Sequence, residues 1–489
     1  MNRRDFLRTV GLGAAAAMAK TLPAAQSEND RPNILWILSE DISPDLSCYG
    51  APLVETPNLD ELARQGIRYT NAFTTGPVCS PSRSAMITGM YQTSIGAHHH
   101  RSHREDGYTL PEPVRLITDY FRQAGYFTAN VTTAAPGVQG SGKTDFNFTL
   151  KAKPFDGTDW NQRKPGQPFF AQLSIGVTHR GGHWKNLSEK VKNPVDPGKV
   201  KLPPYYPDHP VARQDWATYL NSIQLMDEYV GKILKRLDNE NLAKNTVVIF
   251  IGDNGQCHVR GKQWLYDGGI HIPLIIRWPG RLRAGQVRDN MTSAIDISAT
   301  VLKIAGIEPP AHMEGRVFLE AAADGTWKPV KKRDHIIAAR DRCDETIDRI
   351  RCVRTQQCKY IRNFMPERPY TQRNRYKEQS YPVLNLMKGL QAQGKLTPVQ
   401  SLFMAPRKPD EELYDVRSDP YEINNLAVSP EHQAILREMR AILEKWVEDT
   451  GDMGRFPEKL SAITERDRKL ILEEDKSWPY GDSETETPK

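Results

Sequence analysis

Short apolar runs alternate with helical patterns through the first half of the chain, and this alternation constrains the fold most. Four of the runs are typical of buried strands: Asn33–Leu38, Tyr126–Val131, Phe169–Val177 and Thr246–Ile251. Helical patterns lie between them: one opened by Thr56-Pro57-Asn58, then Pro113–Gln123 and Trp216–Leu237. This order predicts an α/β fold, a large mostly parallel mixed sheet with helices on both faces.

Polar side chains follow each of the four predicted strands. In chain order they are Glu40 and Asp41, then Lys143 and Asp145 in a loop, then His179, then Asp253 and Asn254. In sheets of this class, chemistry collects beyond the carboxyl ends of the strands. We therefore expect these residues to meet at one edge of the sheet.

The sequence changes character after Asp334. His335–Ala339 and Lys359–Asn363 are typical of antiparallel strands, and Pro430–Asp449 is a strongly amphipathic helical pattern. We predict a large α/β domain at residues 26–334, a smaller C-terminal α+β subdomain with an antiparallel sheet at residues 335–475, and a polar tail at residues 476–489.

The N-terminus carries a twin-arginine pattern, Asn2-Arg3-Arg4-Asp5-Phe6-Leu7-Arg8, followed by a weakly apolar run and small residues. It predicts an export signal at residues 1–25, recognised by the twin-arginine export machinery. We expect a periplasmic or secreted protein without a stable membrane anchor, because no stretch reaches the roughly 18 apolar residues of a spanning helix.

The net charge argues against nucleic acid as a partner. Loss of the signal removes four basic residues and one acidic residue, so the formal charge falls from +6 to +3. Such a mild charge is not the footprint of a nucleic-acid-binding protein, but it is compatible with an anionic substrate held locally.

The most specific motif is Cys79-Ser80-Pro81-Ser82-Arg83, which precedes the helical segment Ser84–Met90. A cysteine just before a helix start faces the positive end of the helix dipole, and an arginine four residues later can share that face. Cys79 is thus a candidate nucleophile beside an anion site. A buried thiol or a disulfide, for example with Cys48, is the alternative on these grounds.

This motif, followed by Thr88-Gly89, resembles the C-x-P-S-R signature of type I sulfatases, members of the alkaline phosphatase superfamily. Further segments resemble family blocks in family order: Asn33–Asp41, Thr56–Gly66, Gly142-Lys143, Gly252–Gly255 and Pro273–Gly280. The segments 179–183, Pro203–Tyr229 and Glu412–Trp446 are most similar to the heparan N-sulfatase (N-sulfoglucosamine sulfohydrolase) branch. The resemblance implies that a formylglycine-generating, sulfatase-maturing enzyme converts Cys79 to formylglycine, whose hydrate attacks sulfur.

The resemblance also implies a metal site. Glu40, Asp41, Asp253 and Asn254 match the family's four metal-binding positions, with the modified Cys79 beside them. These hard oxygen ligands suit Ca²⁺ and, less well, Mg²⁺. Glu40 departs from the family, which usually has Asp at that position. Zinc is disfavoured because no His or Cys cluster has zinc spacing.

Four further residues match catalytic positions of the family: Arg83, Lys143, His179 and Lys262. The resemblance implies that Arg83 and the metal hold the sulfuryl oxygens, that Lys262 contacts sulfate, and that His179 protonates the leaving group or binds sulfate. Asp145 stands where the family has His, so part of the usual His/Lys arrangement differs here.

Six residues are candidate substrate-binding groups: His98, His99, Arg101, Asp145, His183 and His258. We expect the run His98-His99-His100 to form a solvated or substrate-facing loop after the helix that follows Cys79. A structural histidine is the alternative for His183 and His258.

The sequence thus predicts a sulfatase that removes sulfate from a sulfated glycan. A phosphonate monoester or phosphodiester hydrolase on the same scaffold is the first alternative, and a catalytically inactive glycan-binding protein is the second. Sequence does not choose between an N–S and an O–S scissile bond. Nor does it show whether Cys343, Cys352 and Cys358 form disulfides.

Overall fold

The computed structural model of the protein describes residues 31–474. The predicted export signal at residues 1–25 and the predicted tail at residues 476–489 lie outside this range. None of the helices formed by the described residues is both long enough and apolar enough to cross a bilayer.

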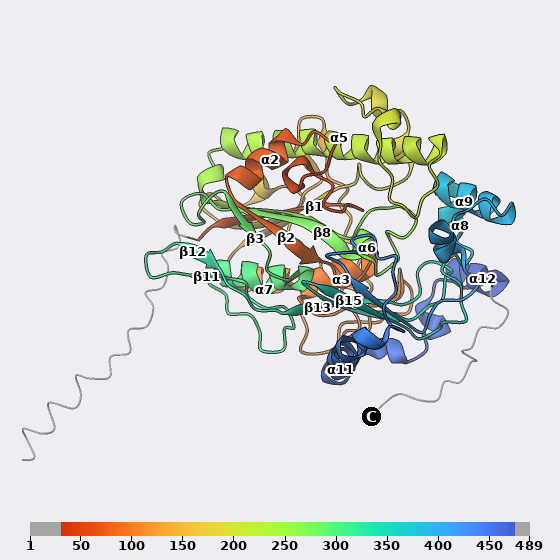
Figure 1. Ribbon diagram of the computed structural model, residues 1–489. Helices are drawn as coiled ribbons and strands as arrows, with labels where there is room; N and C mark the ends of the chain where they lie inside the picture. Colours follow the sequence, from red (N-terminus) through yellow and green to blue (C-terminus); the bar gives the residue numbers. More distant parts are fainter. Residues whose placement is uncertain (1–30, 475–489) are drawn as a thin grey trace, which may run out of the picture. The chain divides into compact units, whose positions relative to one another are not determined.

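A mixed sheet of eight strands forms the centre of the fold (Figure 1). Its main path runs β10-β2-β8-β7-β1-β6-β3, and β9 pairs with β2. The strands are β1 Asn33–Ser39, β2 Ile67–Phe73, β3 Phe127–Asn130, β6 Phe169–Ile175, β7 Thr246–Gly252, β8 His271–Arg277, β9 Gln286–Arg288 and β10 Thr292–Ser293. Only β8 runs antiparallel to its neighbours β2 and β7, so the sheet is mostly parallel, as predicted.

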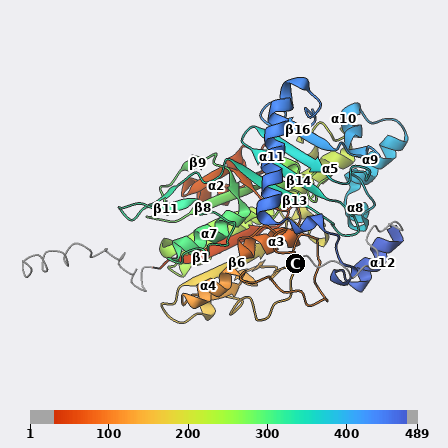
Figure 2. The same ribbon diagram turned by 90° about the horizontal axis from the view of Figure 1, so that it is seen from below.

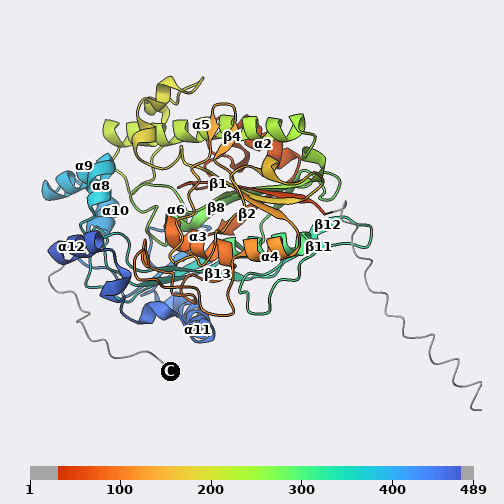
Figure 3. The ribbon, with the colours of Figure 1, turned by 180° about the vertical axis from the view of Figure 1, so that it is seen from behind.

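Helices cover both faces of this sheet (Figures 1 and 3). On one face lie α2 Pro57–Arg64 and α5 Pro210–Asn239, and on the other lie α3 Cys79–Thr88, α4 Ile117–Gln123 and α7 Ala294–Ile304. Alternate residues of β1 belong to the two opposite cores, Trp36 to the side of α3 and α7 and Ile37 to the side of α5. Burial on both faces explains why this strand is continuously apolar instead of alternating.

Two helix starts differ from the sequence prediction. The helix expected from Pro113 begins at Ile117, because Leu116 is still extended (φ −70°, ψ 145°). The helix expected from Trp216 begins at Pro210, where His209 accepts a hydrogen bond from the Val211 N–H and caps the helix.

A second sheet follows Asp334 and is antiparallel throughout, in the order β13-β14-β15-β16. Its strands are β13 His335–Arg340, β14 Ile350–Thr355, β15 Cys358–Asn363 and β16 Glu411–Asp415. Figure 2 shows α11, Gln433–Thr450, lying across this sheet, where its buried Leu436, Met439 and Leu443 share a core with the strands. The predicted combination of a large mixed sheet and an antiparallel C-terminal sheet is confirmed.

The described chain also contains further α-helices and strands. They are β4 Thr133–Ala135, β5 Val138–Gln139, β11 Leu319–Ala321, β12 Trp327–Pro329, α6 Asp267–Ile270, α8 Arg375–Ser380, α9 Pro382–Ala392, α10 Pro398–Ser401 and α12 Glu465–Glu474.

Candidate active site

The acidic residues after β1 and β7 meet because the two strands are parallel neighbours in register. Ser39 lies opposite Gly252, so both strands end at the same level. The backbone N–H of Asp41 donates to Oδ1 of Asp253 over 3.0 Å, and Nδ2 of Asn254 donates to Oδ1 of Asp41 over 3.0 Å. Asp41 has a left-handed backbone (φ 53°), so the chain turns sharply as it leaves the strand.

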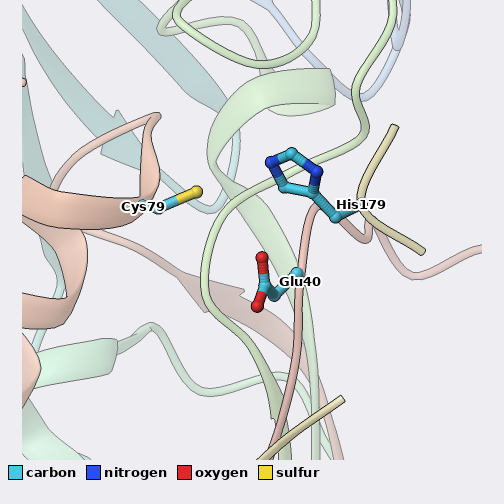
Figure 4. A group of neighbouring side chains, drawn as sticks. All are labelled: Glu40, Cys79 and His179. Atoms are coloured by element: carbon cyan, nitrogen blue, oxygen red, sulfur yellow. The ribbon is translucent and has the colours of Figure 1, made fainter. Parts of the chain in front are cut away.

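His179 reaches the same place from the other neighbour of β1. Strand β6 pairs in parallel with β1, and Ile175 lies opposite Ser39. Nε2 of His179 is 3.9 Å from Oδ2 of Asp41, and about a quarter of its side chain, 27%, stays exposed. In Figure 4 the imidazole of His179, the carboxylate of Glu40 and the thiol of Cys79 point toward one another.

Cys79 is the first residue of α3, so the helix begins five residues earlier than the predicted start at Ser84. Its Sγ lies 3.8 Å from Oδ1 of Asp41, and its side chain is buried. Burial raises the pKa of the Cys79 thiol to about 12, although Lys143 and Lys262 lower it. The unmodified side chain is therefore a protonated thiol at neutral pH, not a reactive thiolate.

Arg83 lies one helical turn after Cys79 and is buried in the same cluster. Its Nε donates to Oδ2 of Asp253 over 2.9 Å, and Nη1 donates to Oγ of Ser174 over 2.8 Å. Nη2 has no hydrogen-bond partner among the described residues and lies 3.6 Å from Oε1 of Glu40. One corner of the guanidinium is thus available to a further acceptor.

Two lysines complete the charge pattern. Nζ of Lys143 is 3.0 Å from Oε2 of Glu40, and Nζ of buried Lys262 is 2.8 Å from Oδ1 of Asp41. Together with Arg83 they place three cations against the carboxylates of Glu40, Asp41 and Asp253. A bound divalent cation would make this cluster net positive, which suits an anionic ligand.

The donor set fits a hard divalent cation. Oδ1 of Asn254 is buried and has no hydrogen-bond partner among residues 31–474, an arrangement that costs free energy unless something binds it. Ligand atoms of Asp41, Cys79 and Asp253 lie within 4.8 Å of one another, and so do those of Glu40, Cys79 and His179. Carboxylate and amide oxygens are the ligands of Ca²⁺ and Mg²⁺.

Asp145 lies beside the lysine of this cluster. Its Oδ2 is 3.7 Å from Nζ of Lys143, and its Oδ1 accepts a hydrogen bond from Arg104 over 2.5 Å. Although burial raises the pKa of Asp145, these two cations together with His100 and Arg101 hold it well below its usual range. Asp145 is therefore an anion at the edge of the cluster.

The histidine run is buried rather than solvated. His99 accepts a hydrogen bond at Nδ1 from the backbone N–H of Arg342 and lies 3.5 Å from Glu458, while His98 packs on His99 with ring centroids 4.2 Å apart. The solvated alternative is wrong, because the C-terminal region covers this segment, and the substrate-facing alternative stays a prediction.

The remaining candidates lie in different surroundings. His183 is exposed in the short 3-10 helix Gly182–Trp184, whereas His258 is buried against Trp216 and Tyr219 with Nε2 3.4 Å from Asp215. His258 is thus an interior histidine.

All six cysteines, which lie within the described residues, are free. The structure therefore contains none of the disulfides left open by the sequence, neither one between Cys48 and Cys79 nor one among the three cysteines of the C-terminal region.

Sequence reasoning missed two residues of the cluster's surroundings. Ser174 holds Arg83, and Tyr376 of α8 places its ring 6.3 Å from that of His179 and 5.9 Å from Nζ of Lys262. Ser174 lies inside a strand pattern and Tyr376 lies far along the chain without a motif, so neither carried a local signal.

Comparison with known proteins identifies the family. The model of the sulfatase family matches residues 32–307, more than half of the chain. The chain belongs to the sulfatase family. A second model, the C-terminal region of N-sulphoglucosamine sulphohydrolase, matches residues 255–382. The predicted family, enzyme class and branch resemblance of this sulfatase are thus confirmed.

Relatives of this sulfatase span most of its length. An ulvan-active sulfatase from Formosa agariphila is 35% identical over 474 residues, covering 88% of this chain and 77% of the relative. The human N-sulphoglucosamine sulphohydrolase is 27% identical and covers 88% of this chain and 93% of its own.

Solved structures share the fold of this sulfatase. A candidate sulfatase from Bacteroides fragilis matches with a TM-score of 0.63 at 20% identity, covering 90% of this chain and 99% of its own. A phosphonate monoester hydrolase from Agrobacterium radiobacter matches with a TM-score of 0.60 at 17% identity, covering 86% of this chain and 96% of its own. At such identities the likeness concerns the fold alone.

Proposed function

We propose that this sulfatase removes sulfate from a sulfated saccharide by means of a formylglycine made from Cys79 and a bound divalent cation. The observation that carries the proposal is the convergence of Cys79 with three carboxylates and three cations at the carboxyl edge of the sheet. A sulfate ester needs this combination, because the cations hold its oxygens while a nucleophile attacks its sulfur.

Glu40, Asp41, Asp253 and Asn254 would hold the metal, with the modified side chain of residue 79 beside them. The all-oxygen donors of these four residues favour Ca²⁺, with Mg²⁺ as the second choice. When bound, the cation supplies charge stabilisation for the sulfuryl oxygens and lowers the pKa of a neighbouring hydroxyl.

Conversion of Cys79 to formylglycine supplies the nucleophile that the thiol does not provide at neutral pH. Because its pKa is raised to about 12, the thiol is a poor nucleophile at neutral pH. Its position at the start of α3 puts the side chain on the metal-binding carboxylates without any rearrangement of the helix. The hydrated aldehyde of formylglycine supplies an oxygen nucleophile there, and a sulfatase-maturing enzyme would be the partner that produces it.

Arg83, Lys143 and Lys262 orient the sulfuryl group. Each lies within hydrogen-bond distance of a carboxylate of the cluster, so their positions are fixed before substrate arrives. Preorganised cations stabilise the charge that develops on the sulfuryl oxygens more effectively than mobile ones. The Arg83 Nη2 without a hydrogen-bond partner is the donor best placed for this.

His179 donates the proton to the leaving group. In the free site Lys262 lowers the pKa of His179 to about 4, burial lowers it further, and Asp41 and Glu40 oppose both effects. A bound sulfate group brings negative charge beside the ring and raises that pKa, since an anion favours the imidazolium. Substrate binding thereby favours the protonated form of His179, which can donate a proton to the leaving group.

The substrate class follows from the relatives. One is named for activity on ulvan and another for N-sulphoglucosamine, and both names denote sulfated saccharides. The twin-arginine pattern supports export to the periplasm or beyond, where such polymers are met. We therefore propose an exported enzyme of sulfated-glycan degradation.

The test is sulfate release from defined saccharides, including an N-sulfated glucosamine, by protein co-expressed with a maturing enzyme. The mass of the Cys79 peptide is measured in the same preparation, and formylglycine lowers it relative to cysteine. The Cys79→Ala variant is the matched control. Absence of modification together with absence of turnover would favour the inactive glycan-binding alternative.

Fold likeness to a phosphonate monoester hydrolase keeps that activity as the second candidate. Turnover of a phenyl sulfate is compared with that of a phenyl phosphonate under identical conditions. We expect faster hydrolysis of the sulfate, and faster hydrolysis of the phosphonate would overturn the proposal.

A further inference from the structure

His100 differs from the two histidines before it in what its ring contacts. Its Nδ1 is buried and lies 2.9 Å from Oδ1 of Asp344, an ion-pair distance without hydrogen-bond alignment, while both ring nitrogens of His98 are buried without a hydrogen-bond partner in the described chain. In His100 only Nδ1 is shut off from solvent in this way. Nε2 therefore keeps access to solvent although the residue is only 5% exposed.

Asp344 is itself held in place by two amides. Its Oδ2 accepts hydrogen bonds from Nε2 of Gln263 over 2.9 Å and from Nδ2 of Asn374 over 3.2 Å. The backbone N–H of His100 donates to the carbonyl of Arg342 over 2.9 Å, which fixes the ring from the main-chain side. These contacts hold the imidazole of His100 and the carboxylate of Asp344 in one relative orientation.

This pair lies between two parts of the active centre. The residue after His100, Arg101, donates its backbone N–H to Oγ of Ser80, the neighbour of Cys79. Gln263, which holds Asp344, is the neighbour of Lys262. The loop that carries His100 and the carboxylate beside its ring are thus attached to Ser80 and Gln263, the sequence neighbours of Cys79 and Lys262.

The chemistry of the pair is that of a hydrogen-bond acceptor. The Asp344 carboxylate oxygen 2.9 Å from Nδ1 favours the tautomer with its hydrogen on Nδ1, which leaves the lone pair on Nε2. Burial lowers the pKa of His100, with Asp344 opposing, so the ring is neutral at pH 7. A neutral nitrogen acceptor binds a hydroxyl or amine hydrogen and offers nothing to a second sulfate or a carboxylate.

We propose that His100, oriented by Asp344, recognises a free hydroxyl on the sugar that carries the scissile sulfate. His100 is then a specificity residue and Asp344 a positioning residue, and a sugar sulfated at both positions is a poor substrate. This inference rests on the proposed function, because it assigns the leaving group to the side of the cluster that His100 borders.

The turnover test compares two substrates of the matured enzyme, nitrophenyl sulfate and the monosulfated saccharide that the wild type hydrolyses fastest. His100→Ala should reduce kcat/KM at least tenfold more for the saccharide than for nitrophenyl sulfate, mainly through KM. His100→Gln keeps an acceptor near the Nε2 position and should recover part of the loss. Asp344→Asn should lower the saccharide activity in the same direction.

A saccharide whose neighbouring hydroxyl is methylated provides the second arm. The wild type should discriminate against it at least tenfold, and His100→Ala should not. The matched control is His103→Ala in the same loop, where the ring contacts Asp106 and the Gly96 carbonyl; its substrate ratio should equal that of the wild type. Equal losses on both substrates, or none, would overturn the inference.

Binding separates this inference from the proposed function. Calorimetry with the same saccharide and Cys79→Ala protein should show at least tenfold weaker binding when His100→Ala is added. A wild type inactive on every sulfate would overturn the proposed function, while unchanged binding would overturn the role of His100 alone. Thermal melting of each variant establishes that the fold is intact.

Discussion

Nε of Arg83 donates a hydrogen bond to Oδ2 of Asp253 over 2.9 Å, although the two residues are 170 positions apart. The same carboxylate accepts the backbone N–H of Asp41 at its other oxygen. One buried side chain therefore connects the helix that begins at Cys79, the end of β7 and the end of β1.

Replacing Cys79 with Ala should abolish turnover of nitrophenyl sulfate, by at least about a thousandfold, because removing a nucleophile from a cooperating set costs that much or more. The fold should remain, since Arg83 and Ser82 hold the start of α3 to Asp253 without the thiol. Activity and thermal melting are measured together. Cys352→Ala, which removes an equally buried thiol from the second sheet, should retain activity. Activity of the Cys79 variant at the wild-type level would rule out residue 79 as the source of the nucleophile.

Replacing Asp253 with Ala should remove metal and activity together. Removing a residue that hydrogen-bonds to a metal ligand typically lowers metal affinity about 10–100-fold. Removing a ligand itself should therefore weaken metal binding at least about a hundredfold. Metal content of the purified protein is measured by atomic emission, beside sulfate release. The exposed Asp324→Asn serves as the control and should keep both. Full metal content in the Asp253 variant would remove this residue from the ligand set.

Replacing Lys262 with Ala should destabilise the metal-free protein more than the calcium-loaded protein. Breaking a buried ion pair leaves the Asp41 carboxylate uncompensated, at a cost of about 3–5 kcal/mol, and a bound cation would offset that charge. Melting temperatures in calcium and in EDTA are compared. In Lys303→Ala, which breaks an exposed pair with Glu308, the change should be below about 1 kcal/mol in both conditions. An identical loss for Lys262→Ala with and without calcium would contradict the metal site.

Stability should fall between pH 6.5 and about 4, in part because of His98. Burial lowers the pKa of His98 to about 4, with Arg351 adding to the effect. The unfolded chain takes up a proton near pH 6.5 and the folded chain only near pH 4, so this contribution to stability is complete above pH 6.5 and is lost as pH falls toward 4. It amounts to at most about 3 kcal/mol.

His98→Phe keeps a ring and removes the titration, so its unfolding free energy should depend less on pH. Urea unfolding at pH 7.5 and pH 5 gives the comparison. A pH dependence identical to that of the wild type would show that His98 does not titrate on unfolding.

Much of the central fold could be predicted from the sequence because its strands are buried on both faces. Strands β1, β6 and β7 are mostly apolar and buried along their whole length, and β1 ends one residue beyond its predicted end. Strand β2 was missed, because half-buried Arg68 and Thr70 interrupt its apolar pattern. The antiparallel insertion of β8 between β2 and β7 depends on pairing, which no local pattern specifies.

The histidine run shows where prediction from sequence fails. A loop of three histidines followed by Arg101 is typical of a polar surface, yet the C-terminal region covers it with Arg342 and Glu458. The partners of the run lie far along the chain, so its burial could not be inferred from its own composition.

The sequence by itself determined the class of sheet, the sulfatase motif around Cys79 and the acidic residues at the strand ends. These features are local: apolar periodicity, motif spacing and the rule that parallel strands end at one edge. The tertiary structure decided which charges compensate one another, which histidine lies beside Asp41 and how strongly burial raises the pKa of the Cys79 thiol. Ion pairing and pKa values depend on burial and on distances between residues far apart in the chain, and only the packed fold sets those.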